Sequence, residues 1–186
     1  MTTDAGRLPL LFLDVDGPLI PFGGPAGRYP VYPESEDPSN PLLGRLDPAH
    51  GPRLAGLPCE LVWATTWGPD ANACLAPRLG LPELRELPDP VGESDLVGAP
   101  DQVGDPAAVL AGDERAGLSW KTRGIVAFAA GRDFVWVDDE IGGADRAWVA
   151  DRHPGRALLW WVDPAVGLAD GDYAAVAAWL RERVGG

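Results

Sequence analysis

Long apolar runs are missing from this sequence. No stretch of the 186 residues reaches the roughly 18 consecutive apolar residues that a membrane-spanning helix needs. The N-terminal MTTDAGRLPLLFLD also lacks the features of a secretory signal, because its apolar run is short and ends in an aspartate rather than at a small-residue cleavage site. We therefore expect a protein that is neither inserted in a membrane nor exported.

Cysteine and positive charge are also scarce. The two cysteines, Cys59 and Cys74, form no C-x-x-C motif, so the sequence contains no disulfide framework and indicates a reducing, cytoplasmic setting. Lys and Arg together number 15 against 28 Asp and Glu, a formal charge of −13. Because such a surface repels polyanions, stable binding to nucleic acid or to an anionic membrane is disfavoured unless a local basic patch offsets the overall field.

Short apolar runs alternate with helix-like segments along most of the chain. Apolar residues make up 46% of the sequence, enough to bury the core of one domain. Buried strands are predicted at residues 8–14, 59–65, 133–138 and 156–163. Helices are predicted at residues 47–56, 69–79, 119–131, 144–150 and 172–184. This order predicts a single α/β domain over residues 1–186, with a mostly parallel sheet and helices on both faces.

Two segments interrupt this alternation. Residues 17–46 are rich in proline and glycine and are predicted to be a loop-rich insertion. Residues 83–114 are acidic and are predicted to be irregular, with a weak strand pattern at 84–87. No internal repeat and no domain boundary is visible in the sequence.

Carboxylates follow two of the predicted strands at the point where each strand ends. Asp14 and Asp16 follow the first strand, and Asp138 and Asp139 end the third. Because ligands bind at the carboxyl ends of the strands in such a sheet, we expect the four carboxylates to lie together. Grouped carboxylates repel one another unless a cation joins them, and Mg²⁺ is the cation that suits hard oxygen ligands at a phosphate site.

A calcium loop at the same place is excluded. The D-V-D-G of residues 14–17 begins like an EF-hand loop, which requires a glycine at position 6 and a glutamate at position 12. Leu19 and Pro25 occupy those positions. The calcium interpretation therefore fails.

In its motifs the sequence resembles the haloacid dehalogenase-like (HAD) phosphohydrolases. FLDVDG matches the family's first motif, a hydrophobic strand followed by D-x-D-G, and LVWATTW matches its second, a strand that ends in Thr or Ser. SWKTRG matches the third motif, a Lys near the start of a helix, and VWVDDE matches the fourth, a strand that ends in two acidic residues. All four occur in the family's order, over residues 10–140, and LVWATTW is most similar to small HAD domains associated with RNA-repair proteins. Pro18 is a departure, since many members have Thr or Val there, but it removes no catalytic group.

This resemblance implies a three-layer, Rossmann-like fold of HAD type and a Mg²⁺-dependent phosphomonoester hydrolase. Asp14 would attack phosphorus to form an aspartyl-phosphate, and Asp16 would protonate the leaving oxygen and then act as base toward water. Lys121 would neutralise phosphate charge, and either Thr65 or Thr66 would donate a hydrogen bond to a phosphoryl oxygen. The implied metal ligands are Asp14, Asp16, Asp138 and Asp139, and the backbone carbonyl of Asp16 is expected to contribute. The resemblance does not decide whether Asp138 or Asp139 binds the metal directly.

The sequence does not decide between two classes of phosphoester substrate. Neither interrupting segment looks like the full cap domain that sets specificity in this family, so the site has little or no cap. A small phosphorylated molecule and a phosphorylated nucleic-acid end are both allowed. Trp67 and Trp120 either line the substrate mouth or pack in the core, and the strand residues Trp63, Trp136, Trp160 and Trp161 are predicted to be core.

A second class of function competes with the enzyme. The chain could be a catalytically silent HAD-fold domain that serves as a binding or regulatory module. Dehalogenation is disfavoured, because the second Asp of the D-x-D serves phosphoryl leaving groups. The sequence does not indicate an oligomeric state.

Overall fold

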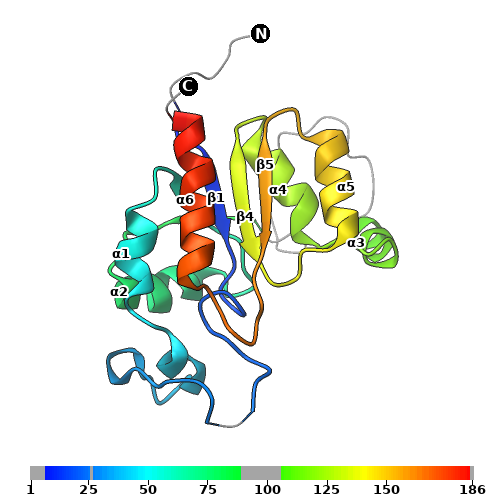
Figure 1. The fold of residues 1–186 in the computed structure, drawn as a ribbon. Coiled ribbons are helices and arrows are strands. Elements are labelled where there is room, and N and C mark those ends of the chain that lie inside the picture. The colour runs from blue at the N-terminus through cyan, green and yellow to red at the C-terminus, as the bar shows by residue number, and fades with distance from the viewer. Residues whose placement is uncertain (1–6, 26, 89–105, 185–186) are drawn as a thin grey trace.

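The computed structural model of the chain describes residues 7–25, 27–88 and 106–184 (Figure 1). At its centre lies a five-stranded sheet in the order β3-β2-β1-β4-β5, with every neighbouring pair parallel. The strands are β1 (Leu10–Leu13), β2 (Glu60–Trp63), β3 (Arg85–Glu86), β4 (Phe134–Asp138) and β5 (Ala157–Trp161). The prediction of an α/β fold with a parallel sheet is confirmed.

Helices cover both faces of the sheet and give a three-layer, Rossmann-like arrangement (Figure 1). On one face lie α1 (His50–Ala55), α2 (Ala76–Leu79) and α6 (Asp170–Val184). On the other lie α4 (Lys121–Ala129) and α5 (Gly143–Arg152), with α3 (Pro106–Arg115) beside them. Shorter turns complete the chain: the 3₁₀ helices η1 (Pro33–Ser35) and η2 (Pro41–Arg45), and the π-helical η3 (Ala71–Leu75).

The layers follow from the alternation of side chains along β1. Leu11 and Leu13 point into one apolar cluster, which includes residues of α1, α2 and α6. Leu10 and Phe12 point into the other, which includes residues of α4 and α5. Because β1 is buried on both faces, its sequence is continuously apolar rather than alternating.

Local boundaries differ from prediction in two places. The helix predicted from 47 begins only at His50, because the Asp47 carboxylate accepts the Ala49 N–H at 2.8 Å and holds a turn before it. The acidic segment 83–114 was predicted irregular, and this is wrong at Pro106–Arg115, which is helical. This helix follows an acidic stretch of the sequence, and its Asp113 pairs with Arg123 of α4 at 2.6 Å. Residues 89–105 of the same prediction lie outside the described residues.

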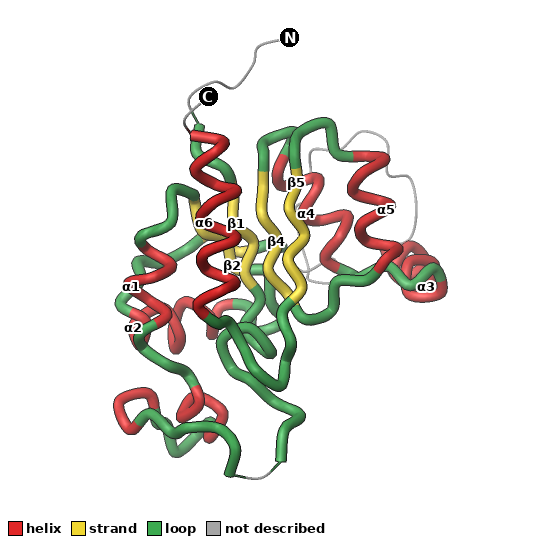
Figure 2. Tube along the Cα trace, in the orientation of Figure 1, coloured by secondary structure: helices red, strands yellow, loops and turns green. Residues whose placement is uncertain are grey.

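The carboxyl ends of the strands all lie at one end of the molecule, where the long loops gather (Figure 2). The chain moves outward from β1 to β2 and β3 on one side, and from β4 to β5 on the other. The gap between β1 and β4 is therefore the point where the winding reverses, the usual ligand-binding place in an open α/β sheet. No helix among the described residues is long and apolar enough to cross a membrane.

Candidate active site

A buried lysine joins two buried aspartates at this switch point. Asp14 follows β1 directly and Asp138 is the last residue of β4, and the Asp14 N–H donates to the Val137 carbonyl at 3.0 Å, which keeps the two strand ends adjacent. Lys121 Nζ lies 2.9 Å from Asp14 Oδ2 and 2.7 Å from Asp138 Oδ2. Because all three side chains are almost fully buried, this ionic contact is shielded from solvent.

Three carboxylates in the same place form a group suited to a cation. One carboxylate oxygen from each of Asp14, Asp138 and Asp139 can be chosen so that the three lie within 4.8 Å of one another. Asp138 is already held by the protein, because its oxygens also accept the Trp136 indole N–H at 3.0 Å and the Glu140 N–H at 2.8 Å. Asp139 is only half-buried, so its carboxylate is the more accessible of the adjacent pair.

Burial dominates the protonation of this group. It raises the pKa of Asp14 to about 7, against the attraction of Lys121 and with the repulsion of Asp138. Burial and Asp138 also raise the pKa of Asp139 to about 6. For Lys121, burial lowers the pKa, but Asp14 and Asp138 together outweigh it and the pKa is raised. The lysine therefore stays charged, and Asp14 is partly protonated near neutral pH.

The position of Lys121 depends on a further buried carboxylate, Asp145, that was not among the predicted site residues. Asp145 of α5 accepts hydrogen bonds from Ser119 N at 2.8 Å, from Gly142 N at 2.8 Å and from the Thr122 hydroxyl. It thereby fixes the start of α4, which begins at Lys121, to the start of α5. Asp145 could have been found in the sequence, because it lies three residues after Gly142, where an acidic side chain commonly caps the start of a helix.

Asp16 lies apart from the carboxylate group. Its carboxylate accepts the Trp67 indole N–H at 3.0 Å and is not one of the three that come within 4.8 Å of one another. After Asp14 the chain turns, with the Ile20 N–H donating to the Val15 carbonyl at 2.9 Å, so Asp16 leaves the strand direction. The expectation that four carboxylates lie together therefore holds for three.

The two threonines that end the second predicted strand are placed differently. Thr65 is buried, and its hydroxyl oxygen lies 3.4 Å from the Trp67 backbone N–H. Thr66 is exposed. Of the two, Thr65 follows Ala64, whose N–H donates to the Leu13 carbonyl, so it lies beside the end of β1, next to Asp14.

Several tryptophans contact the residues of this site. Besides Trp67 and Trp136, the Trp120 ring lies with its centre 5.7 Å from Lys121 Nζ, and the Trp161 indole N–H donates to the Asp139 carbonyl at 2.7 Å. Trp161 is 49% exposed, so the prediction that it belongs to the core is wrong. It ends the edge strand β5, where no further strand covers it.

Fold and site together define an α/β protein with a buried carboxylate–lysine cluster at the switch point of a parallel sheet. In comparisons with known proteins, no family model, no curated protein and no solved structure matches the chain. The function is therefore inferred from the geometry of the site and from the chemistry of its residues.

Proposed function

We propose that the chain is a Mg²⁺-dependent phosphomonoester hydrolase of HAD type that acts through an aspartyl-phosphate. The observation that carries this proposal is the single lysine nitrogen bound to both Asp14 and Asp138, with Asp139 in the same group. A nucleophilic carboxylate, a fixed positive charge and a cluster of oxygen ligands are the parts that phosphoryl transfer needs. The resemblance of the motifs to the HAD family supports the same assignment.

The donor set fits a magnesium ion. It consists of carboxylate oxygens only, and Mg²⁺ prefers hard oxygen ligands while keeping several waters. Asp14 and Asp139 would bind the ion directly, the Asp16 backbone carbonyl would be a further ligand, and Asp138, already held by three donors, would orient the group. When bound, Mg²⁺ supplies positive charge that stabilises the phosphoryl oxygens.

The chemistry falls to two aspartates. A carboxylate oxygen of Asp14 attacks phosphorus, so a new P–O bond forms while the bond to the leaving oxygen breaks, and Asp16 gives its proton to that oxygen. Water then attacks phosphorus of the aspartyl-phosphate, Asp16 takes the proton from the water, and release of phosphate restores Asp14. Trp67 holds the Asp16 carboxylate through its indole N–H and so positions the proton donor.

The remaining groups bind the phosphoryl oxygens. Lys121 keeps Asp14 Oδ2 in place and offsets the negative charge of the bound phosphate. Thr65, buried beside the end of β1, is better placed than the exposed Thr66 to donate a hydrogen bond to a phosphoryl oxygen. The substrate is either a small phosphoester or a phosphorylated nucleic-acid end.

The experiment that tests the function is a panel of phosphoesters with and without Mg²⁺. The panel includes mononucleotides, sugar phosphates and oligonucleotides phosphorylated at the 5′ or the 3′ end. We expect turnover of at least one member that depends on Mg²⁺ and stops with a chelator. Saturable Mg²⁺ binding without any turnover would favour the competing proposal, a catalytically silent binding domain.

Mg²⁺ should stabilise the protein more at alkaline than at acidic pH. Burial raises the pKa of Asp14 from 3.8 to about 7 and that of Asp139 from 3.8 to about 6. Because the folded protein therefore favours the protonated forms, these two groups support folding at low pH, and without metal this contribution to stability is lost as the pH rises through the two raised values. Magnesium must displace these protons, so its binding strengthens over the same range. We expect about 10 mM MgCl₂ to raise the melting temperature by several degrees at about pH 8 and by much less at about pH 5. A shift that is equal at both pH values would contradict this assignment of the metal ligands.

Gly17 leaves the space in which the Asp139 carboxylate lies. Its φ is +84°, and a Cβ added there would lie 2.6 Å from Asp139 Cγ. Gly17→Ala should therefore displace Asp139 and weaken Mg²⁺ binding by about 10–100-fold, as expected when a metal ligand loses its orientation. Titration calorimetry with Mg²⁺ measures the loss.

Gly23→Ala provides the matched control. Gly23 has nearly the same φ, +80°, but an added Cβ would meet nothing within 4 Å. This variant therefore carries the backbone strain without the contact to Asp139. If both alanine variants bind Mg²⁺ equally well, Gly17 does not act through Asp139.

A further inference from the structure

A cavity lies outside the carboxylate site. It has a volume of about 450 Å³, within the range of pockets that bind small organic molecules. Its walls come from three segments: the loop after β1 through Tyr32, the η2–α1 region from Arg45 to Arg53, and the connection from β5 to α6. Neither Asp14, Lys121 nor the 138/139 pair lines it, so it is distinct from the proposed catalytic centre.

Hydrogen bonds between loops build one wall of this cavity. The Leu168 N–H donates to the Pro18 carbonyl at 2.9 Å, and the Phe22 N–H donates to the Pro164 carbonyl at 2.8 Å. The loop after β1 and the loop after β5 are thus fastened together, as their course in Figure 2 shows. The cavity is therefore formed by ordered backbone contacts rather than by exposed side chains alone.

Two arginines in the wall lack the carboxylate partners that this chain supplies in excess. Among the described residues, neither Arg28 nor Arg45 forms a salt bridge, although acidic side chains outnumber basic ones 28 to 15. Arg45 is half-buried, donates to the Pro21 carbonyl at 3.2 Å and lies with its guanidinium carbon 5.1 Å from the Tyr29 ring centre. These contacts orient the guanidinium and leave most of its five donors unused.

The acids in the wall already have partners. Asp47 accepts the Tyr32 hydroxyl proton at 3.1 Å and the Ala49 N–H at 2.8 Å. Asp170 pairs with Arg53 at 2.8 Å. With Arg53, the wall carries three arginines against these two carboxylates, a net formal charge of +1 with His50 neutral, so the cavity keeps local positive charge in a strongly negative protein.

We propose that this cavity binds a small organic oxyanion, with Arg28 and Arg45 holding its phosphate or carboxylate group. Guanidinium groups bind the oxygens of either anion through paired hydrogen bonds. Prolines, Val166 and Leu168 give part of the wall an apolar surface, which suits the carbon skeleton of such a molecule. This proposal concerns binding alone and does not depend on the phosphatase activity.

The test measures anion binding to the full chain in the presence of a chelator. Without a divalent ion, the carboxylate group repels anions and Lys121 is already paired, so binding at the catalytic site is suppressed. Inorganic phosphate, adenosine monophosphate and citrate are titrated separately, which distinguishes a phosphate ligand from a carboxylate ligand. We expect saturable binding of at least one of these probes.

Arg28→Gln is the informative variant. The Arg28 side chain is exposed and makes no salt bridge within the described residues, so its removal should leave the fold intact, which an unchanged melting temperature without anion verifies. We expect binding to weaken about tenfold, the loss of one charge-assisted hydrogen bond. Arg28→Lys should recover part of the affinity, because it restores the charge without the paired donors.

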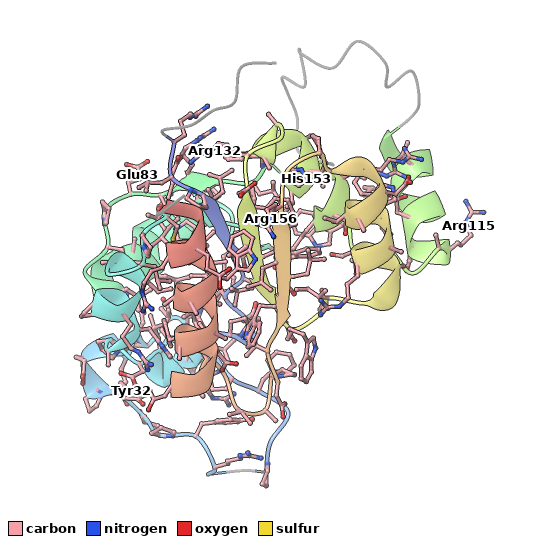
Figure 3. All side chains as sticks on the ribbon, turned by 45° about the horizontal axis from the view of Figure 1, so that its top comes forward. Tyr32, Glu83, Arg115, Arg132, His153 and Arg156 are labelled. Atoms are coloured by element: carbon pink, nitrogen blue, oxygen red, sulfur yellow. The ribbon has the colours of Figure 1, made fainter. Side chains whose placement is uncertain are left out.

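Arg115→Gln is the matched control. Arg115 is also exposed but lies on α3, far from the cavity residue Tyr32 (Figure 3). It should bind the probes as the wild type does. The proposal is overturned if no probe binds saturably, if Arg28→Gln and Arg115→Gln behave alike, or if Asp14→Asn alone abolishes binding, since the last result would place the anion at the catalytic site.

Discussion

Replacing Asp14 by Asn abolishes phosphomonoester hydrolysis in our proposal, with kcat lowered by at least ~10³-fold. The amide keeps the shape of the carboxylate but cannot form an acyl-phosphate bond to phosphorus. The substitution also removes one of the three carboxylates that would hold the metal, so we expect Mg²⁺ affinity to fall in the same variant. Steady-state kinetics on the best substrate of the panel, with magnesium titrated for each variant, measures both effects.

A surface variant serves as the control for Asp14→Asn. Asp151 is exposed and pairs only with the adjacent Arg152, so Asp151→Asn should keep wild-type kcat. The melting temperature of Asp14→Asn should stay close to that of the wild type, because Lys121 keeps its ion pair with Asp138 and burial already disfavours the charge of Asp14, whose pKa it raises to about 7. Equal rates in the wild type and Asp14→Asn at saturating Mg²⁺ would show that hydrolysis does not use this residue.

Replacing Lys121 by Met produces the largest loss of stability that we expect from one substitution. The variant leaves Asp14 and Asp138 buried next to each other without a positive charge, and removal of one member of a buried ion pair costs about 3–5 kcal/mol. Urea unfolding followed by fluorescence measures the free energy of unfolding. Hydrolysis should be lost as well, because no other cationic side chain among the residues that the structure describes pairs with Asp14 or Asp138.

Two further variants separate charge from shape. Lys121 is the only lysine in the chain, which otherwise uses arginine for its positive charges. Lys121→Arg keeps the charge but must fit a larger planar group into a site that is 2% exposed, so it should recover little of the stability. Arg152→Met breaks an exposed pair and should cost less than about 1 kcal/mol. Losses of similar size in Lys121→Met and Arg152→Met would mean that the buried pair is not the source of the effect.

Much of the sheet was predictable because each strand carries its own local signal. The apolar runs that contain β1 and β4 are continuous, since both faces of these strands are covered, and the polar residues that stop them mark the site. The α3 helix was not predictable in this way. Its residues, PAAVLAGDER, come at the end of an acidic segment and were grouped with it, and its ion pair with Arg123 of α4 is visible only in the structure.

Two residues show where local patterns were not enough. Trp161 has an aromatic side chain in an apolar strand, and only its place on the edge strand β5 exposes it. Asp16 lies two residues from Asp14 in the sequence, yet a turn directs its carboxylate to Trp67, 51 residues further along the chain. In both cases the neighbouring elements, rather than the residue type, decide the role.

The sequence by itself determined which residues end the buried strands, because hydrophobicity and strand termination are local properties of the chain. Only the tertiary structure decided that the ends of β1 and β4 are neighbours and that the start of α4 places Lys121 between them. It also decided that Arg28 and Arg45 share a cavity. The physical reason is that strand order and loop closure depend on packing between segments distant in sequence, which no local pattern encodes.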